Sequence, residues 1–99
     1  MNLKEGWVAA RRLFLLRLLV EVGGSANESV LRTAARAGGF ARSSADDIRT
    51  DLDHLHALGC ITEEWHGRLR VVTLTERGED AAWGRVAVEG VEHAVWRRG

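Results

Sequence analysis

The chain has 99 residues, 45% of them hydrophobic and 28% charged, and its 14 basic side chains balance its 14 acidic ones. This length supports one domain with a modest core and excludes two. The zero net charge argues against strong non-specific binding to DNA, which depends on phosphate neutralisation. A single cysteine cannot form an internal disulfide and predicts a reducing, cytoplasmic location. No apolar stretch approaches the roughly 18 residues that span a membrane.

The first predicted helix runs from about Lys4 to Val22. Its second half is apolar on several faces, which predicts either the centre of the core or a dimer seam. Arg11 and Arg12 precede the apolar residues as in a twin-arginine export signal, but Arg17 and Glu21 interrupt the apolar run. We therefore expect a buried helix and no targeting signal, with the first two arginines solvated at the surface.

The second predicted helix begins after Ser25 or Asn27, either of which can cap it, and ends at Gly38-Gly39. Arg32 and Arg36 lie four residues apart and form a basic stripe on one side of this helix. The stripe could flank a neighbouring helix that contacts DNA, and ordinary solvation of the surface is the alternative.

The third predicted helix covers residues 44–58, with its start at Ser43 or Ser44. Ser44 and Asp47 have the spacing of a capping box, and Gly59 stands where a helix end favours positive φ. One face is apolar at helical spacing and defines the core side through Ile48, Leu52 and Leu55. Two helices joined by a short turn predict a helix-turn-helix.

The opposite face of this third helix is the one that a recognition helix would place in the major groove. Arg49 and Thr50 suit contacts to bases or phosphates. Asp46 and Asp53 on the same face, however, would approach a polyanion. The sequence therefore leaves two alternatives open: direct reading of bases, or a face that is solvated or contacts protein.

Two β-rich runs, residues 60–65 and 69–74, flank a His66-Gly67 turn and predict a β-hairpin. By the two-residue period of a strand, Arg68 and Arg70 would share one face beside the hairpin tip. With the histidine they make this tip a candidate wing that reaches the DNA backbone or a minor groove. The alternative is an edge ribbon that its charges keep soluble.

Eight side chains are thus candidates for DNA contact, in the second helix, the following turn, the third helix and the wing around residues 65–70. Arg49 and Thr50 would read bases, while Arg42 and Ser44 would hold phosphate. The full set is Arg36, Arg42, Ser44, Arg49, Thr50, His66, Arg68 and Arg70.

The chain ends in a short helix and an apolar tail. Thr75 caps the helix, which runs from Glu76 to about Trp83. We expect residues 1–84 to form the domain, and residues 85–99 to pack on the first helix or on a second subunit. The first helix and the tail around Trp96 would then hold a homodimer together.

Neither a catalytic nor a metal site is predicted. His54, His56, Cys60 and His66 invite a metal-binding interpretation. However, the first two of these histidines point about 160° apart on a helix and cannot share an ion unaided. The chain shows no nucleophile–base pair, no phosphate-binding glycine loop and no paired carboxylates in an evident pocket. We therefore expect neither an enzyme nor a cofactor.

Several separated motifs, spread over residues 13–91, resemble known winged-helix proteins. The run from Ile48 to Gly59 resembles the third helix of ArsR and MarR winged-helix repressors. Leu74-Thr75-Glu76-Arg77-Gly78 resembles the Leu-Thr-x-x-Gly that follows the wing in MarR-like and PadR-like proteins. Motifs similar to small ArsR-like proteins of Mu-like prophages are Ser25–Ser29, Ile48–Thr50, Thr73–Gly78 and Gly84-Arg85.

The resemblance implies a winged helix-turn-helix, mainly α with a small β-hairpin, in the order helix, helix, helix, strand, strand, helix. It implies a DNA-binding transcriptional regulator of bacterial or prophage type, and a twofold dimer would place both third helices in successive major grooves of a palindromic site. The Cys-x-Cys pair of the metal-sensing ArsR third helix is absent, which argues against metalloregulation. The alternative is a winged-helix module that binds protein and little or no DNA, which the neutral charge and acidic third helix favour.

Overall fold

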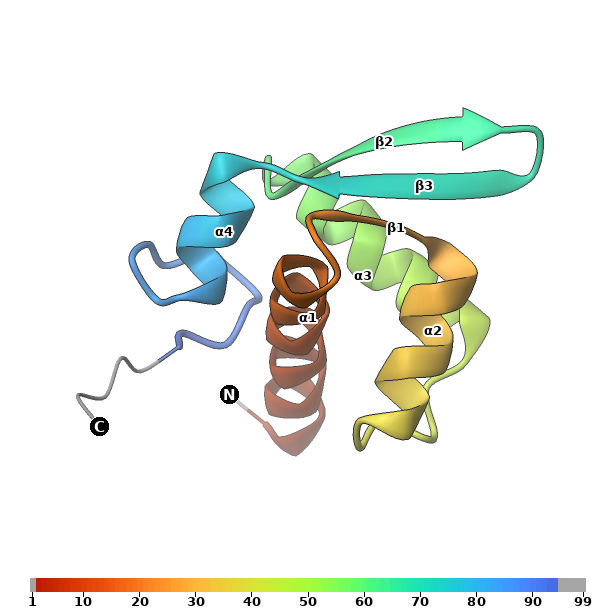
Figure 1. Ribbon diagram of the computed structural model, residues 1–99. Coiled ribbons are helices and arrows are strands. Elements are labelled where there is room, and N and C mark those ends of the chain that lie inside the picture. The colour runs from red at the N-terminus through yellow and green to blue at the C-terminus, as the bar shows by residue number, and fades with distance from the viewer. Residues whose placement is uncertain (1, 95–99) are drawn as a thin grey trace.

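The computed structural model describes residues 2–94, which fold into four helices and one three-stranded antiparallel sheet (Figure 1). This part of the chain is a small mixed α/β domain. In chain order the elements are α1 (Leu3–Glu21), β1 (Ser25–Asn27), α2 (Glu28–Ala37), α3 (Ala45–Ala57), β2 (Ile61–His66), β3 (Leu69–Leu74) and α4 (Glu76–Ala82). The helices and the hairpin follow the predicted order, and β1 is an element that the sequence pattern does not predict.

β3 is the central strand of the sheet, with β1 on one side and β2 on the other. β2 and β3 form the predicted hairpin, in the register that pairs His66 with Leu69 next to the turn. The turn consists of Gly67 and Arg68 rather than of His66 and Gly67. Gly67, the first residue of the turn, has a positive φ of 64°, whereas Arg68, the second, does not have a positive φ. This combination is the pattern of a type II′ turn.

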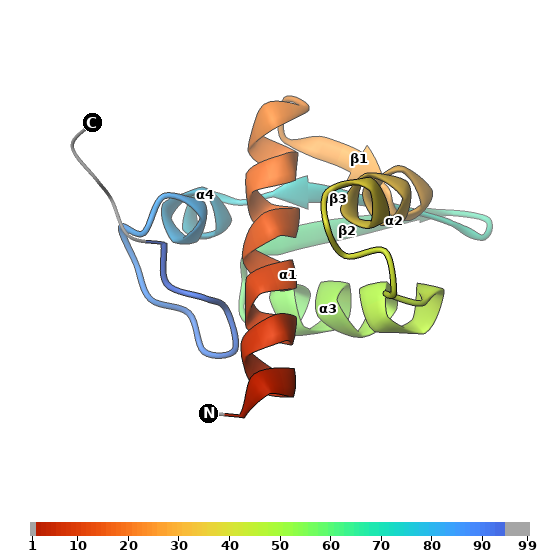
Figure 2. The ribbon, with the colours of Figure 1, turned by 90° about the horizontal axis from the view of Figure 1, so that it is seen from below.

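α1 crosses the middle of the molecule, between α4 on one side and α2 with α3 on the other (Figure 2). Because it contacts several elements at once, its residues Leu15, Leu16 and Leu19 are fully buried. The largest fully buried apolar side chains of the other elements are Leu31, Ile48, Leu52, Leu55, Ile61 and Val72. The core side predicted for the third helix is therefore confirmed.

Side-chain caps fix the starts of α2 and α3. Asn27 Oδ1 accepts a hydrogen bond from Val30 N at 2.9 Å, so this residue, of the two predicted, caps α2. Ser44 Oγ accepts from Asp47 N at 3.0 Å, and Asp47 Oδ2 accepts from Ser44 N at 2.9 Å. The predicted capping box is therefore confirmed. Gly59, just beyond α3, has the expected positive φ of 77°.

Two arginines of α1 bind a buried carboxylate, so the expectation that they are solvated is wrong. Asp51 is fully buried and pairs with Arg11 and, at 3.0 Å, with Arg12 Nε. Arg11 also donates to Ser43 Oγ at 3.3 Å. Asp51 follows Ile48 by three residues and so lies on the core side of α3, where a carboxylate needs paired cations. This cluster joins α1 to α3.

Residues 85–94 pack against α1. Glu92 N donates a hydrogen bond to Ala9 O of α1 at 3.1 Å, and Val88 joins the buried core. The predicted contacts of Trp96 lie outside the described residues. None of the helices within residues 2–94 is both long and apolar enough to cross a membrane.

Candidate nucleic-acid interface

α3 and the β2–β3 hairpin are neighbours, and the start of α3 and the hairpin tip lie at the same end of the molecule (Figures 1 and 2). The hairpin extends beyond the helices at this end. Because the apolar side of α3 faces the core, its residues Asp46, Thr50 and Asp53 are exposed. The helix and the hairpin predicted to contact DNA are therefore adjacent, and the core holds both in place.

Three of the predicted DNA-contacting arginines have no hydrogen-bond or ion-pair partner among residues 2–94, and all three are exposed. Arg36 lies in the last turn of α2, Arg42 in the connection to α3, and Arg68 in the hairpin turn. We call Arg36, Arg42 and Arg68 the rim arginines. A guanidinium is weakly hydrated and matches phosphate geometry, so these side chains can bind phosphate without first breaking an internal pair.

Arg49 is exposed on α3 but is already paired with two carboxylates. Its Nε lies 3.3 Å from Glu28 Oε2, and its Nη1 lies 3.1 Å from Asp46 Oδ1. The Asp46 side chain is 89% exposed, so water screens this second pair and makes it weak. Arg49 would therefore bring these two carboxylates close to any base or phosphate that its Nη2 group contacts.

Arg70 does not project from the wing, and the prediction that it shares an exposed face with Arg68 is wrong. Arg70 is only 4% exposed. It lies opposite Trp65 in the hairpin, and the Trp65 ring centroid is 5.5 Å from the guanidinium carbon. Arg68 lies in the turn, where the two-residue alternation of a strand does not apply.

Three carboxylates hold the Arg70 guanidinium. Its Nη2 lies 2.6 Å from Glu63 Oε2 and 2.8 Å from Asp53 Oδ1, and its Nη1 lies 3.6 Å from Glu28 Oε1. Desolvation works to lower the pKa of Arg70, but its hydrogen bonds to Asp53 and Glu63 outweigh this and raise the pKa. Through these pairs Arg70 connects its own strand, β3, to α2, α3 and β2. Its role is therefore to hold these elements in position.

These side chains form one continuous cluster, which we call the α3 charge network. Glu28 joins its two halves, because it is within ion-pair distance of both Arg49 and Arg70. Its members hold four carboxylates against two guanidinium groups, so this part of the face carries excess negative charge. The members are Glu28, Asp46, Arg49, Asp53, Glu63 and Arg70.

Sequence reasoning identified the acids of α3 but missed Glu28 and Glu63. Glu63 could have been found, because it lies opposite Val72 and is therefore a diagonal cross-strand neighbour of Arg70 on the same face. Glu28 carries no such signal, since its role depends on how α2 packs beside α3.

Ser44 and His66 lie at the start of α3 and at the hairpin tip. The Ser44 hydroxyl oxygen accepts the capping hydrogen bond, and its proton can still be donated to a phosphate. His66 is exposed, and its Nε2 lies 3.7 Å from Glu64 Oε1. Both side chains therefore remain able to contact a ligand.

The side chains considered as metal ligands have separate partners. His54 Nε2 lies 2.6 Å from Glu89 O. His56 Nδ1 lies 3.8 Å from Glu63 Oε1. Cys60 is buried, and burial raises the pKa of its thiol, which keeps the thiol protonated and unreactive. Residues 2–94 contain no group of three or more histidine, cysteine, aspartate or glutamate side chains that could hold a metal ion.

Comparison with known proteins places the chain in a phage lineage. Over 82 residues it is 42% identical to the uncharacterized protein gp26 of Escherichia phage Mu, and the match covers 83% of this chain and 84% of that protein. The chain belongs to the family of this phage protein. The Mu-like part of the resemblance is thereby confirmed. No protein-family model and no solved structure matches the chain.

In this member of the gp26 family, the α3 face offers two kinds of chemistry. The rim arginines and the Ser44 hydroxyl can bind anionic oxygens. The α3 charge network, with its excess of carboxylates, favours cationic groups and opposes anions. The function depends on which of the two governs approach of a ligand.

Proposed function

We propose that the chain is a DNA-binding transcriptional regulator of phage or bacterial type that acts in the cytoplasm and has a winged helix-turn-helix fold. In this proposal α2 and α3 form the helix-turn-helix, α3 is the recognition helix, and the β2–β3 hairpin is the wing. The observation that carries it is a hairpin that extends past α3, combined with rim arginines that have no partner among residues 2–94. This arrangement supports backbone contacts beside a helix in the major groove.

Backbone contacts would come from the ends of the helices and from the wing. Arg68 would bind phosphate or enter a minor groove from the hairpin tip, with His66 beside it. Arg36, Arg42 and the Ser44 hydroxyl would bind phosphates near the start of α3. These contacts supply affinity and orientation but carry no base sequence.

Base contacts would come from the exposed side of α3. Thr50 is exposed there and can contact a base directly. Arg49 would join it after leaving Asp46, whose exposed carboxylate holds it only weakly. Arg70 would keep the wing in register with α3 without touching DNA.

Titration of the purified chain into a duplex of random sequence, read by fluorescence anisotropy at low and then moderate salt, tests this function. Wild-type binding should fall steeply with salt. Arg68→Ala should weaken binding and reduce the slope of log affinity against log salt by about 0.9, the value for one phosphate contact. The matched control, Arg85→Ala, removes the same charge from an arginine that is paired with Asp80 of α4. It should leave the affinity and the slope near the wild-type values.

Two results would argue against the proposal. Absence of wild-type binding even at low salt would reject DNA binding. Equal losses for the two variants would mean that net charge alone acts, and would remove the wing from the mechanism.

A second candidate, a winged-helix module that binds protein, is favoured by the α3 charge network. Arg49 is paired in the free chain, and Asp46 and Asp53 remain exposed beside it, which favours contact with a basic protein surface. For this candidate, wild type should bind no DNA at low salt and should retain a host protein in a pull-down. Asp46→Lys, at a side chain that is 89% exposed, should lose that protein, whereas Asp80→Lys on α4 should retain it.

A further inference from the structure

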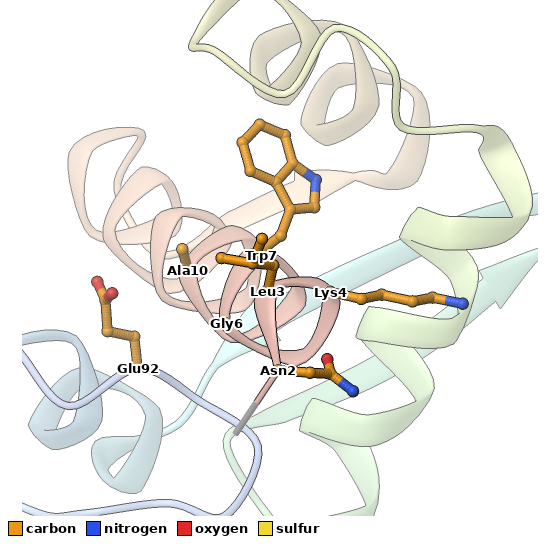
Figure 3. A pocket seen from close by; sticks show the side chains of 7 residues that line it. All are labelled: Asn2, Leu3, Lys4, Gly6, Trp7, Ala10 and Glu92. Atoms are coloured by element: carbon orange, nitrogen blue, oxygen red, sulfur yellow. The ribbon is translucent and has the colours of Figure 1, made fainter.

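Within residues 2–94, one long side of α1 is covered only in part, where the Phe40 ring packs on the Trp7 ring at 4.9 Å between centroids. Leu3 is 95% exposed and Trp7 is 46% exposed, although both are large and apolar. Figure 3 shows them with Ala10 along an open groove that Glu92 borders on the other side. In the view of Figure 2 no other element passes in front of α1.

The residues on this side of α1 recur at alternating steps of four and three. In order they are Leu3, Trp7, Ala10, Phe14, Arg17 and Glu21. Such spacing has a period of 3.5 residues and marks the seam of a coiled coil, in which each position meets a second helix. Four of the six positions are apolar, and the two polar ones come last. The described part of the chain places no helix along this seam, and the contact with Phe40, at 5.4 Å between ring centroids, leaves Phe14 partly exposed.

We propose that the α1 seam binds α1 of a second copy of this chain in antiparallel orientation. The seam has two kinds of position, which alternate along α1. One kind is Leu3, Ala10 and Arg17, and the other is Trp7, Phe14 and Glu21. In an antiparallel coiled coil, a position of one kind faces a position of the other kind on the second helix. The layers are then Leu3 with the partner's Glu21, Trp7 with the partner's Arg17, and Ala10 with the partner's Phe14. A twofold axis repeats each layer, so the interface is closed and uses the same patch of both copies.

Side-chain size and charge select this orientation over the parallel one. An antiparallel pair places small Ala10 against large Phe14, and places the Arg17 guanidinium over an indole, where a cation–π contact forms. The antiparallel pair also brings Lys4 close to the partner's Glu21, because Lys4 directly follows Leu3, which shares a layer with that glutamate. A parallel pair would instead place Arg17 against Arg17 and Glu21 against Glu21, which is repulsive.

The contacts of Arg17 agree with this role. Its Nε donates to Ala82 O at 3.0 Å, and its guanidinium lies 5.9 Å from the Trp83 ring centroid. The side chain is thus held at the end of α4, next to an indole that is itself 38% exposed, and its Nη groups have no hydrogen-bond partner among residues 2–94. Trp83 would extend the apolar surface of the dimer beyond the helix.

Charge reversal tests the antiparallel orientation. Sedimentation velocity over a range of protein concentrations should show a monomer–dimer equilibrium for wild type. Lys4→Glu or Glu21→Lys alone should weaken the dimer about tenfold, because each change makes two symmetry-related attractive contacts repulsive. The double variant should recover the wild-type equilibrium. Both side chains are exposed, so neither change disturbs the core.

Cysteine cross-linking tests the same orientation independently. Leu3→Cys protein mixed with Glu21→Cys protein should form a disulfide between copies under mild oxidation, because these two positions share a layer. Each variant alone should remain unlinked, and Cys60 is buried and should not interfere. Cross-linking of Leu3→Cys with itself would overturn the antiparallel orientation. A wild type that is monomeric at every concentration would overturn the dimer. Neither result depends on whether the chain binds DNA.

Discussion

The arginines of this chain are either buried in ion pairs or exposed and available to a ligand. The carboxylates near each arginine decide which of the two it is. Arg11 and Arg70 are each 4% exposed, and Arg11 is paired with one carboxylate and Arg70 with three. Arg68, two residues before Arg70, is exposed and has no partner among residues 2–94. Desolvating a charge is costly unless it is paired, so burial of a guanidinium in this fold requires carboxylates around it.

Arg70→Ala should lower the free energy of unfolding by about 2 to 4 kcal/mol, because it leaves the partly buried Glu63 without its arginine partner and leaves Glu28 with Arg49 alone. Chemical denaturation followed by circular dichroism measures the difference. Arg68→Ala is the matched control and should change the free energy of unfolding by less than about 0.5 kcal/mol. Equal stabilities of the two variants would contradict the positioning role of Arg70.

Sequence patterns predict which side of an element faces the core better than they predict the partner of a charge. Helical spacing placed Ile48 and Leu52 in the core correctly, and Asp51 shares their side of α3, so its burial could have been inferred. Its partner Arg11, however, is 40 residues away. No local pattern specifies that contact, because it arises only when α1 packs across α3.

At the scale of elements, the start of α3 was predictable because it depends on local chemistry. The hydrogen bond from Ser44 N to the Asp47 carboxylate lowers the pKa of Asp47 more than partial burial raises it. A carboxyl group whose pKa is lower in the folded state than in the unfolded chain stabilises the fold above its ordinary pKa. That contribution is lost as the pH falls through the folded value.

Asp47→Asn should therefore be less stable than wild type at neutral pH, and the difference should shrink as the pH falls below the ordinary carboxyl pKa. Thermal unfolding of both proteins from neutral pH down to about pH 2 measures this. Ser44→Ala, which removes the other half of the capping box, should cost about 1 kcal/mol at neutral pH. A constant difference between Asp47→Asn and wild type across the pH range would contradict the role of the ionised carboxylate.

Two other features of the elements follow from contacts that a sequence does not reveal. β1 has three residues, too few to show strand alternation, and forms because Ser25 to Asn27 pair with β3. Gly78 completes the Leu-Thr-x-x-Gly motif, and a Cβ at this position would lie 2.0 Å from Cys60 O. The motif thus reflects the close approach of α4 to the chain just before β2, which only glycine permits.

At the scale of the whole molecule, a net charge of zero conceals an uneven distribution. The α3 charge network holds more carboxylates than guanidinium groups, while the rim arginines have no partners among residues 2–94. A neutral chain can therefore attract phosphate at the rim arginines and oppose it along the middle of α3. The balance between these two effects separates the DNA-binding function from the protein-binding one.

Asp46→Asn should raise the affinity for duplex DNA about two- to threefold and steepen its salt dependence, because it removes an anion from α3 and frees Arg49 from one of its two pairs. The Asp46 side chain is 89% exposed, so the fold should be unaffected. Anisotropy titration with the same duplex measures the change. Glu76→Gln is the matched control, since it alters the net charge equally on α4, away from the hairpin tip (Figure 1). An equal gain in both variants would mean that net charge governs binding. If wild type binds DNA and Asp46→Asn leaves its affinity unchanged, α3 does not face DNA, and its acids are better explained as a surface for a protein partner.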